Sequence, residues 1–174
     1  MSQSDDRRDD GGRPDAGPEA GARLGSNVTL EPLSDTNRGP VALLRLDASQ
    51  QRFVASNEET LAEIEDEASS IGLVIASGGV PVGLLAYEVF ENRDGDRGIS
   101  IFRLMIDRCH QRRGYARQAL TLFLRELSSG PDRIGTVRIC YLPDNDVSRV
   151  LYASLGFAEI GLDEDGEIIA QLAV

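Results

Sequence analysis

The sequence is poor in the residues from which metal centres and disulfide frameworks are built. Its 174 residues include two cysteines, Cys109 and Cys140, whose separation matches no metal-binding motif, and a single histidine, His110. Because no His/Cys cluster exists to hold zinc, we expect no metal cofactor, and two isolated cysteines favour a reduced, cytoplasmic protein. A lone histidine in a loop is expected to be a solvated or hydrogen-bonded neighbour rather than a catalyst.

Long apolar runs and a surplus of basic residues are also missing. No stretch approaches the roughly 20 apolar residues that cross a bilayer, and the first ten residues lack the apolar core of a secretory signal. Lys and Arg number 18 against 29 Asp and Glu, a net charge of −11. This balance disfavours nucleic acid and membranes as partners, because neutralising phosphates needs a basic surface. It is compatible with a cationic small substrate, and equally with acidity that serves solubility alone.

Two regions of different composition divide the chain. Residues 1–25 consist mainly of Asp, Arg, Gly and Pro with almost no large apolar side chains. They cannot bury enough surface to offset their ordering entropy, so we expect a disordered tail without a catalytic role. Residues 26–174 have the length of one domain with a proper core.

The hydrophobic pattern predicts the element order β-α-α-β-β-β-α-β-α-β-β, an α/β (α+β) fold with a mixed sheet flanked by helices. A capping box at Ser56 to Glu59 marks the start of the second helix, and the turn at Ser77 to Gly79 joins two strands in a hairpin. The expected strands are 28–32, 71–76, 80–90, 99–106, 134–141, 157–161 and 167–173, and the expected helices are 40–53, 56–70, 115–128 and 146–155.

The segment that ends the strand at Ile106 and enters the helix at Tyr115 is the most informative in the chain. Gly114 allows a tight turn, and a small residue before a helix leaves backbone N–H groups unpaired at the positive end of the helix dipole. Arg112 and Arg113 add positive charge. The pattern indicates a site for an anion such as a diphosphate, although a glycine turn before a surface helix would look the same. It is neither a Walker loop nor a dinucleotide fingerprint, because the required glycines and lysine are absent.

Two motifs resemble those of the GNAT superfamily of N-acyltransferases. Gln111-x-x-Gly114-x-Ala116 is similar to the Gln/Arg-x-x-Gly-x-Gly/Ala loop that holds the pyrophosphate of acetyl-CoA in that superfamily. Residues 145–157 resemble its second signature, Asn-x-x-Ala-x-x-Leu-Tyr-x-x-x-Gly-Phe, with Ser148 in place of the usual Ala. The resemblance covers residues 27–174 and implies a GNAT-like mixed, mostly antiparallel sheet.

The resemblance also implies an activity, namely direct acetyl transfer from acetyl-CoA to a primary amine in a ternary complex. Tyr152 would protonate the departing thiolate, although a buried aromatic on an amphipathic helix would give the same pattern. Met105 and Ile106 would offer backbone hydrogen bonds to the pantetheine arm, and Asn145 would contact the arm near its thioester. The pyrophosphate would be held by Gln111, Arg112, Arg113, Gly114, Tyr115 and Ala116.

The acceptor side is less sharply defined. Residues 53–63, 103–107 and 165–168 resemble the bacterial diamine, spermine and spermidine N-acetyltransferases, which implies a small cationic acceptor such as a polyamine. Glu58 and Glu59 could then receive its distal ammonium, but they are equally explained by stabilisation of the helix dipole.

A general base is expected because an ammonium has no lone pair with which to attack. Many superfamily members carry a Glu on the strand before the pyrophosphate loop, where this chain has Phe102 and Arg103. Glu88, on the preceding strand, is the candidate, with an outward-facing strand carboxylate as the alternative. The sequence leaves open a protein N-terminal or lysine acetyltransferase and a non-catalytic acyl-CoA-binding sensor. It is also compatible with a homodimer.

Overall fold

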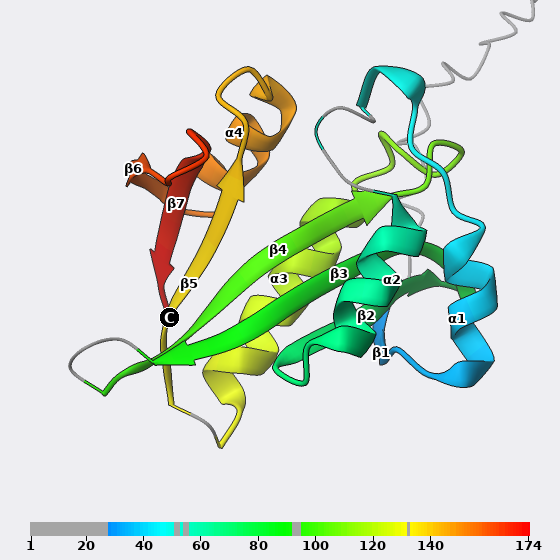
Figure 1. Ribbon diagram of the computed structural model, residues 1–174, viewed down its shortest axis with the longest axis horizontal. Helices are drawn as coiled ribbons and strands as arrows, with labels where there is room; N and C mark the ends of the chain where they lie inside the picture. The colour runs from blue at the N-terminus through cyan, green and yellow to red at the C-terminus, as the bar shows by residue number, and fades with distance from the viewer. Residues whose placement is uncertain (1–27, 51–52, 54–55, 92–94, 132) are drawn as a thin grey trace, which may run out of the picture.

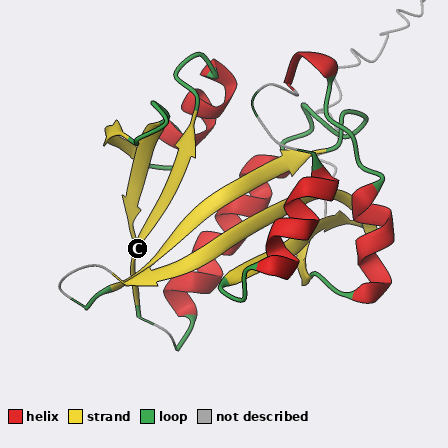
Figure 2. Ribbon diagram, in the orientation of Figure 1, coloured by secondary structure: helices red, strands yellow, loops and turns green. Residues whose placement is uncertain are grey.

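The computed structural model describes residues 28–50, 53, 56–91, 95–131 and 133–174. The predicted tail, residues 1–25, lies outside this part of the chain. The described residues form a seven-stranded sheet in the order β1-β2-β3-β4-β5-β7-β6, with helices on both faces (Figures 1 and 2). The strands are β1 (Val28–Pro32), β2 (Ser70–Ser77), β3 (Val80–Glu91), β4 (Arg97–Ile106), β5 (Ile134–Tyr141), β6 (Ala158–Leu162) and β7 (Ile168–Ala173), and the helices are α1 (Asp35–Ala42), α2 (Asn57–Asp66), α3 (Tyr115–Ser129) and α4 (Asp146–Ala153), with a short 3-10 turn at Ala48–Gln50.

The strand pairing confirms the predicted mixed, mostly antiparallel sheet. β4 and β5 run parallel, and the other neighbouring strands pair antiparallel. The predicted hairpin is β2–β3, whose turn glycines Gly78 and Gly79 have φ angles of 59° and 78°. Positive φ at both central turn residues matches the right-handed twist of a two-residue hairpin.

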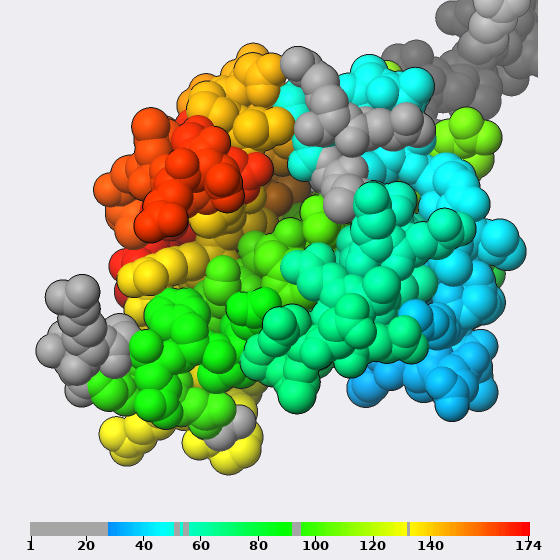
Figure 3. Space-filling view, viewed as in Figure 1, coloured from blue at the N-terminus to red at the C-terminus, as the bar shows by residue number. Residues whose placement is uncertain are grey.

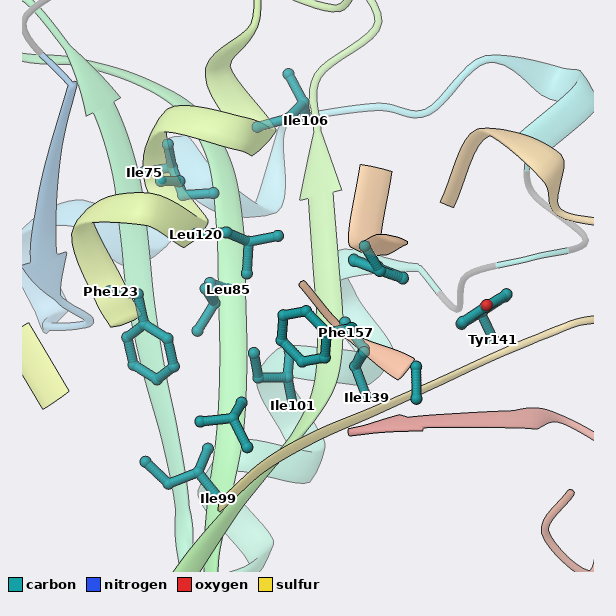
Figure 4. Packing of buried hydrophobic residues seen from close by; sticks show 14 of the residues in the cluster. Ile75, Leu85, Ile99, Ile101, Ile106, Leu120, Phe123, Ile139, Tyr141 and Phe157 are labelled. Carbon is teal, nitrogen blue, oxygen red and sulfur yellow. The ribbon is translucent and has the colours of Figure 1, made fainter. Parts of the chain in front are cut away.

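Each face of the sheet packs against its own helices. On one face, Leu120 and Phe123 of α3 pack on Leu85 and Ile101 of the central strands (Figure 4). On the other face, Val41 of α1 and Leu61 of α2 form a smaller cluster with strand residues that include Met105. The central strands are therefore buried on both sides, which fixes the position of the end of β4.

β4 and β5 separate halfway along their length. Their parallel pairing ends at Ile101 and Ile139. A β-bulge lies at the same level, because Ala86 of β3 pairs with Arg103 and Tyr87 pairs with Ile101, which leaves Phe102 as the extra residue. Bulges bend a strand and increase its twist. Beyond this point β4 and β5 diverge and open a V-shaped gap in the sheet (Figure 1).

The first helix differs from the prediction of residues 40–53. α1 begins after Ser34, whose backbone N–H donates to the Asn37 side chain (2.9 Å), and it ends at Ala42. Carbonyl groups at and just after its end accept hydrogen bonds from a residue that is distant in the sequence. The Asn57 side chain donates to the carbonyl of Val41 (2.9 Å) and to that of Leu44 (3.1 Å). No local pattern announces such a cap. Residues 51–52 of the predicted helix lie outside the described residues.

The remaining elements match their predicted positions within a few residues. α2 starts at the predicted capping box, in which the Ser56 side chain accepts from the Glu59 N–H, but it ends at Asp66 rather than at Ser70. No helix in the described part of the chain is both long and apolar enough to cross a membrane.

Candidate active site

A cavity of about 640 Å³ opens where β4 and β5 separate. It is lined by the end of β4, the loop before α3, the start of α3, and α4. Nearly all residues predicted to bind acetyl-CoA meet here, although they come from two separate segments of the chain. The predicted residues that line it are Met105, Ile106, Gln111, Arg112, Gly114, Tyr115, Ala116, Asn145 and Tyr152.

The loop before α3 is shaped to receive an anion. Arg112 has a φ angle of 61°, which is unusual for a residue with a side chain, and Gly114 has a φ angle of 80°. A left-handed residue other than glycine is strained by about 1–2 kcal/mol, a cost found mostly at functional sites. Gly114 is the N-cap of α3 and supplies no side-chain cap. The first-turn N–H groups therefore face the cavity beside Arg112, an arrangement that fits a diphosphate.

Two predicted phosphate-binding residues have structural tasks in this loop. The Gln111 side chain donates to the Ile106 carbonyl (2.9 Å) and to the side chain of Gln50 (2.6 Å), and so ties the loop to the strand end and to the 3-10 turn. Arg113 does not line the cavity, and its side chain donates to the Cys109 carbonyl (3.1 Å). Arg113 therefore stabilises the loop through this hydrogen bond, from outside the cavity.

Asp107 fixes the end of β4 to the segment that follows α1. Its buried carboxylate accepts from the N–H of Arg45 (2.8 Å) and from that of Cys109 (2.9 Å). Burial by itself would raise the pKa of Asp107, but these two N–H donors bring it below its usual range. The charged carboxylate therefore holds the loop in place.

His110 also lines the large cavity. Its Nδ1 atom is buried and has no hydrogen-bond partner among the described residues, and its ring centroid lies 6.3 Å from that of Tyr115. The sequence led us to expect a solvated or hydrogen-bonded histidine. Instead, His110 lies on the cavity wall and its buried Nδ1 atom is unpaired among the described residues.

Tyr152 lies on α4 at the inner end of the cavity and is 5% exposed. Its ring packs against Tyr141 (5.4 Å between centroids) and Phe157 (5.9 Å). Burial raises the pKa of the phenol far above its usual value, and the side chain of Ser148, one helical turn earlier, counteracts part of this shift. The phenol therefore stays protonated at neutral pH.

Asn145 orients this helix as its N-cap. Its side chain accepts from the backbone N–H of Ser148 (3.2 Å), so the amide oxygen is engaged in capping α4. Because Asn145 also lines the cavity, its amide nitrogen can donate to a ligand there.

A second, smaller cavity of about 50 Å³ lies in the gap between β4 and β5. It shares Phe53, Leu104, Asn145, Ser148 and Tyr152 with the large cavity, so the two meet at Tyr152. Its other walls come from the strands on either side of the gap, namely Ile101, Phe102 and Arg103 of β4 and Ile139, Cys140 and Tyr141 of β5.

The predicted acceptor-side carboxylates line neither cavity. Glu88 accepts a long hydrogen bond from Ser70 (3.4 Å) on the neighbouring strand. Glu58 is exposed on the first turn of α2. Glu59 accepts from the Ser56 N–H (2.8 Å), and this capping bond is the main reason that its pKa is lowered. The structure does not bring these three residues together with Tyr152.

Other polar residues, which sequence reasoning did not select, surround the small cavity. Arg103 lines it and reaches Glu63 of α2 (3.5 Å). Behind Cys140, the side chains of Asp163 and Glu167 converge, and their ligand-type atoms and the Cys140 sulfur lie within 4.8 Å of one another. Burial and the two carboxylates raise the pKa of Cys140 to about 11. These residues are far apart in the sequence, so no local motif signals them.

Comparisons with known structures show the same fold. An acetyltransferase from Thermus thermophilus superposes with a TM-score of 0.68 at 18% identity, over 84% of this chain and 97% of that chain. The ribosomal-protein-S18-alanine N-acetyltransferase of Escherichia coli gives 0.61 at 22% identity, over 84% and 94%. Arabidopsis thaliana Naa50, in complex with the bisubstrate analogue CoA-Ac-MVNAL, gives 0.63 at 15% identity, over 84% and 99%.

The sequence comparison identifies the family. No curated protein matches the sequence. The model of the Acetyltransferase (GNAT) family matches residues 41–157, a span that contains the anion-binding loop, both cavities' strands and Tyr152. The cavity at the β4–β5 gap and this match lead to one conclusion: the chain belongs to the GNAT acetyltransferase family and is an acetyl-CoA-dependent N-acetyltransferase.

Proposed function

We propose that this enzyme transfers the acetyl group of acetyl-CoA directly to the primary amine of a second substrate, with Tyr152 as the proton donor. The observation that carries this proposal is the position of Tyr152, which lines both cavities. A thioester at the inner end of the large cavity and an amine in the small cavity would meet beside its phenol. Such an arrangement favours direct transfer, because the two reactants are held in contact.

In the proposed step an amide bond forms and the thioester bond breaks. The thioester supplies the activated acetyl group, and the amine nitrogen forms a bond to its carbonyl carbon while the bond from that carbon to sulfur breaks. Tyr152 gives its proton to the leaving sulfur, and the proton released by the nitrogen goes to a carboxylate, directly or through water. Stabilising charge that develops only in the transition state accelerates the chemical step.

For the carboxylate, Glu167 is better placed than Glu88. Glu167 lies within 4.8 Å of the sulfur of Cys140, which lines the small cavity, whereas Glu88 is engaged with Ser70 on a neighbouring strand. Burial, Asp163 and Asp165 raise the pKa of Glu167, which makes it a stronger base. We therefore propose Glu167 as the proton acceptor and keep Glu88 as the alternative.

Two acceptor classes follow from the sequence and from the relatives. The resemblance to polyamine acetyltransferases suggests a small cationic amine. The names of two structural relatives, an alanine N-acetyltransferase of a ribosomal protein and a Naa50 bound to a peptide-containing bisubstrate analogue, suggest a peptide N-terminus. Neither Glu58 nor Glu59 lines a cavity, so the structure offers the polyamine no dedicated anionic pocket at these residues.

The test is a thiol-release assay with acetyl-CoA over a panel of diamines, polyamines, amino acids, amino amides and short peptides. We expect saturable release with at least one primary amine, and an N-acetylated product by mass spectrometry. Tight acetyl-CoA binding without release across the whole panel would contradict the proposal and favour a non-catalytic acyl-CoA-binding sensor.

A further inference from the structure

Arg103 is the one charged side chain that the described residues place in the wall of the small cavity. It lies on β4 directly after the bulge and pairs with Ala86, so its position is fixed by the centre of the sheet. Its side chain is 15% exposed. Arg103 does not line the large cavity, so its partner is to be sought in the acceptor rather than in acetyl-CoA.

The hydrogen-bonding capacity of Arg103 is only partly used. Its Nε atom is buried and has no partner among the described residues. Its Nη2 atom reaches Glu63 at 3.5 Å, at the outer limit for a hydrogen bond, and Glu63 itself is 43% exposed. A buried donor without a partner destabilises the folded protein, so the free Nε–H needs an explanation, and an acceptor atom of a bound ligand supplies one.

Charge around Arg103 is arranged with the cation inside and the carboxylates at the edge. Glu63 approaches from α2, and Glu167 on the other side of the gap lies close enough for Arg103 to offset part of the rise in its pKa that burial and two Asp residues cause. Figure 3 shows this face, with α2 on one side, β5 to β7 on the other, and β4 between them.

Resting on the proposed function, we infer that Arg103 selects amines that carry a carbonyl or carboxylate oxygen next to the amino group. A guanidinium offers Nε and Nη donors side by side, a geometry that matches one such oxygen or a pair of them. The oxygen would satisfy the free Nε–H and hold the amine toward Tyr152. The α-amino group of an amino acid, an amino amide or a peptide has this chemistry.

A polyamine fits this cavity poorly. Its amines are separated by methylene groups that offer no hydrogen-bond acceptor, so the Nε–H would stay unpaired. Its second ammonium would also be repelled by the guanidinium.

The experiment compares wild type, Arg103→Gln and Arg103→Lys in steady-state acetylation. The acceptors are tripeptides with varied first residues, the matching free amino acids and amino amides, their decarboxylated amines, and spermidine. We expect wild type to favour the α-amino carbonyl acceptors. Arg103→Gln should lower kcat/KM for them by roughly 10- to 100-fold, mainly through KM, and leave the decarboxylated amines within about twofold. Comparing peptides and amino amides with free amino acids shows whether the substrate is a peptide N-terminus or a free amino acid.

Controls separate this effect from misfolding. Arg125→Gln removes an exposed arginine of α3 that lines neither cavity, and it should match wild type throughout. Arg103→Lys keeps the charge but loses the paired donors, and it should recover only part of the selectivity. Calorimetric acetyl-CoA binding should be unchanged in all variants, and thermal melts should show a cooperative unfolding transition for each of them.

Two results would overturn the inference: a wild-type preference for spermidine, or an equal loss on all acceptors in Arg103→Gln. If wild type releases no thiol with any amine, the proposed function itself fails. In that case calorimetry tests whether Arg103 binds the acceptor: alaninamide is titrated into the CoA-bound wild type and into CoA-bound Arg103→Gln. Binding that weakens in Arg103→Gln supports the recognition of the oxygen, and binding that does not change contradicts it.

Discussion

The two cavities that meet at Tyr152 are built in different ways. The large one takes about half of its wall from one continuous segment, residues 104–117, in which a strand end, a strained loop and a helix start follow one another. The small one is assembled from separate segments, namely β4, β5, the start of α4 and Phe53, and Glu63 and Glu167 approach two of its lining residues from outside. Local sequence thus determines much of the large cavity, proposed to hold acetyl-CoA, whereas the small cavity, proposed to hold the acceptor, depends on tertiary structure.

This contrast has a functional counterpart. A diphosphate can be held by backbone N–H groups, which nearly every residue has, so a short motif suffices for it. An amine acceptor is distinguished by side chains, and these can change without disturbing the sheet. Variants on the two sides are therefore expected to separate binding of acetyl-CoA from choice of acceptor.

The largest effect is expected at Tyr152, where the two cavities meet. Tyr152→Phe keeps the ring contacts with Tyr141 and Phe157 but removes the phenolic proton. We expect turnover to fall by roughly 10- to 1,000-fold while acetyl-CoA affinity and the melting temperature stay close to wild type. Steady-state rates, calorimetry and melts measure this. Full turnover in the Phe variant would assign Tyr152 a purely structural role.

A smaller loss is expected on the acceptor side. Glu167→Gln should lower kcat/KM by roughly 10- to 100-fold near neutral pH and leave acetyl-CoA affinity unchanged, because it removes the proposed proton acceptor. Glu164→Gln, an exposed carboxylate in the same turn, is the control. A similar loss in Glu88→Gln with none in Glu167→Gln would transfer the role to Glu88.

Glu167→Gln should also change how the stability of the protein depends on pH. Burial and two nearby Asp residues raise the pKa of Glu167 in the folded state above its ordinary value of 4.5. The unfolded chain then releases this proton first, so stability falls as pH rises from about 4.5 through the folded-state pKa. Glu167→Gln should match wild type near pH 4 and melt about 1–3 °C higher near pH 8. Equal melting temperatures near pH 8 would contradict the raised pKa.

On the acetyl-CoA side, Gly114→Val tests the loop. A branched side chain at a φ angle of 80° strains the loop and blocks the approach of phosphate to the backbone. We expect acetyl-CoA to bind about tenfold more weakly, equivalent to the loss of one or two backbone hydrogen bonds. Gly78→Val, at a φ angle of 59° in the β2–β3 turn, imposes similar strain away from the site and should bind normally. Unchanged affinity in folded Gly114→Val would refute the loop assignment.

The smallest effect is expected from the tail. Deleting residues 1–25 should change kcat/KM by less than about twofold, because this segment has no apolar face with which to dock. Activity assays and thermal melts of the shortened chain measure this. A clear loss would show that the tail contributes to the site.

The sequence predicted the architecture well. Periodicity, turn glycines and the capping box at Ser56 give the element order and most boundaries. The loop from Gln111 to Ala116 is recognisable because its chemistry is local. The misplaced α1 shows the limit, since the carbonyls at its end are capped by Asn57, which lies 16 residues beyond Val41.

The acceptor side was beyond prediction for the same reason. Glu88 and Glu59 are carboxylates in suitable elements, but strand register and capping direct them to Ser70 and Ser56. Arg103 reaches the small cavity because a bulge lies at Phe102, and bulges leave no clear mark in a single sequence. Glu167 approaches Cys140 only through the pairing of β5 with β7.

The hydrogen bond from Gln111 to Gln50 couples the two cavities. Gln50 also accepts the backbone N–H of Phe53 (2.9 Å), and Phe53 lines both cavities. Occupation of the phosphate loop will restrict this chain of contacts and so prearrange one wall of the acceptor cavity. By thermodynamic linkage each substrate then tightens the binding of the other.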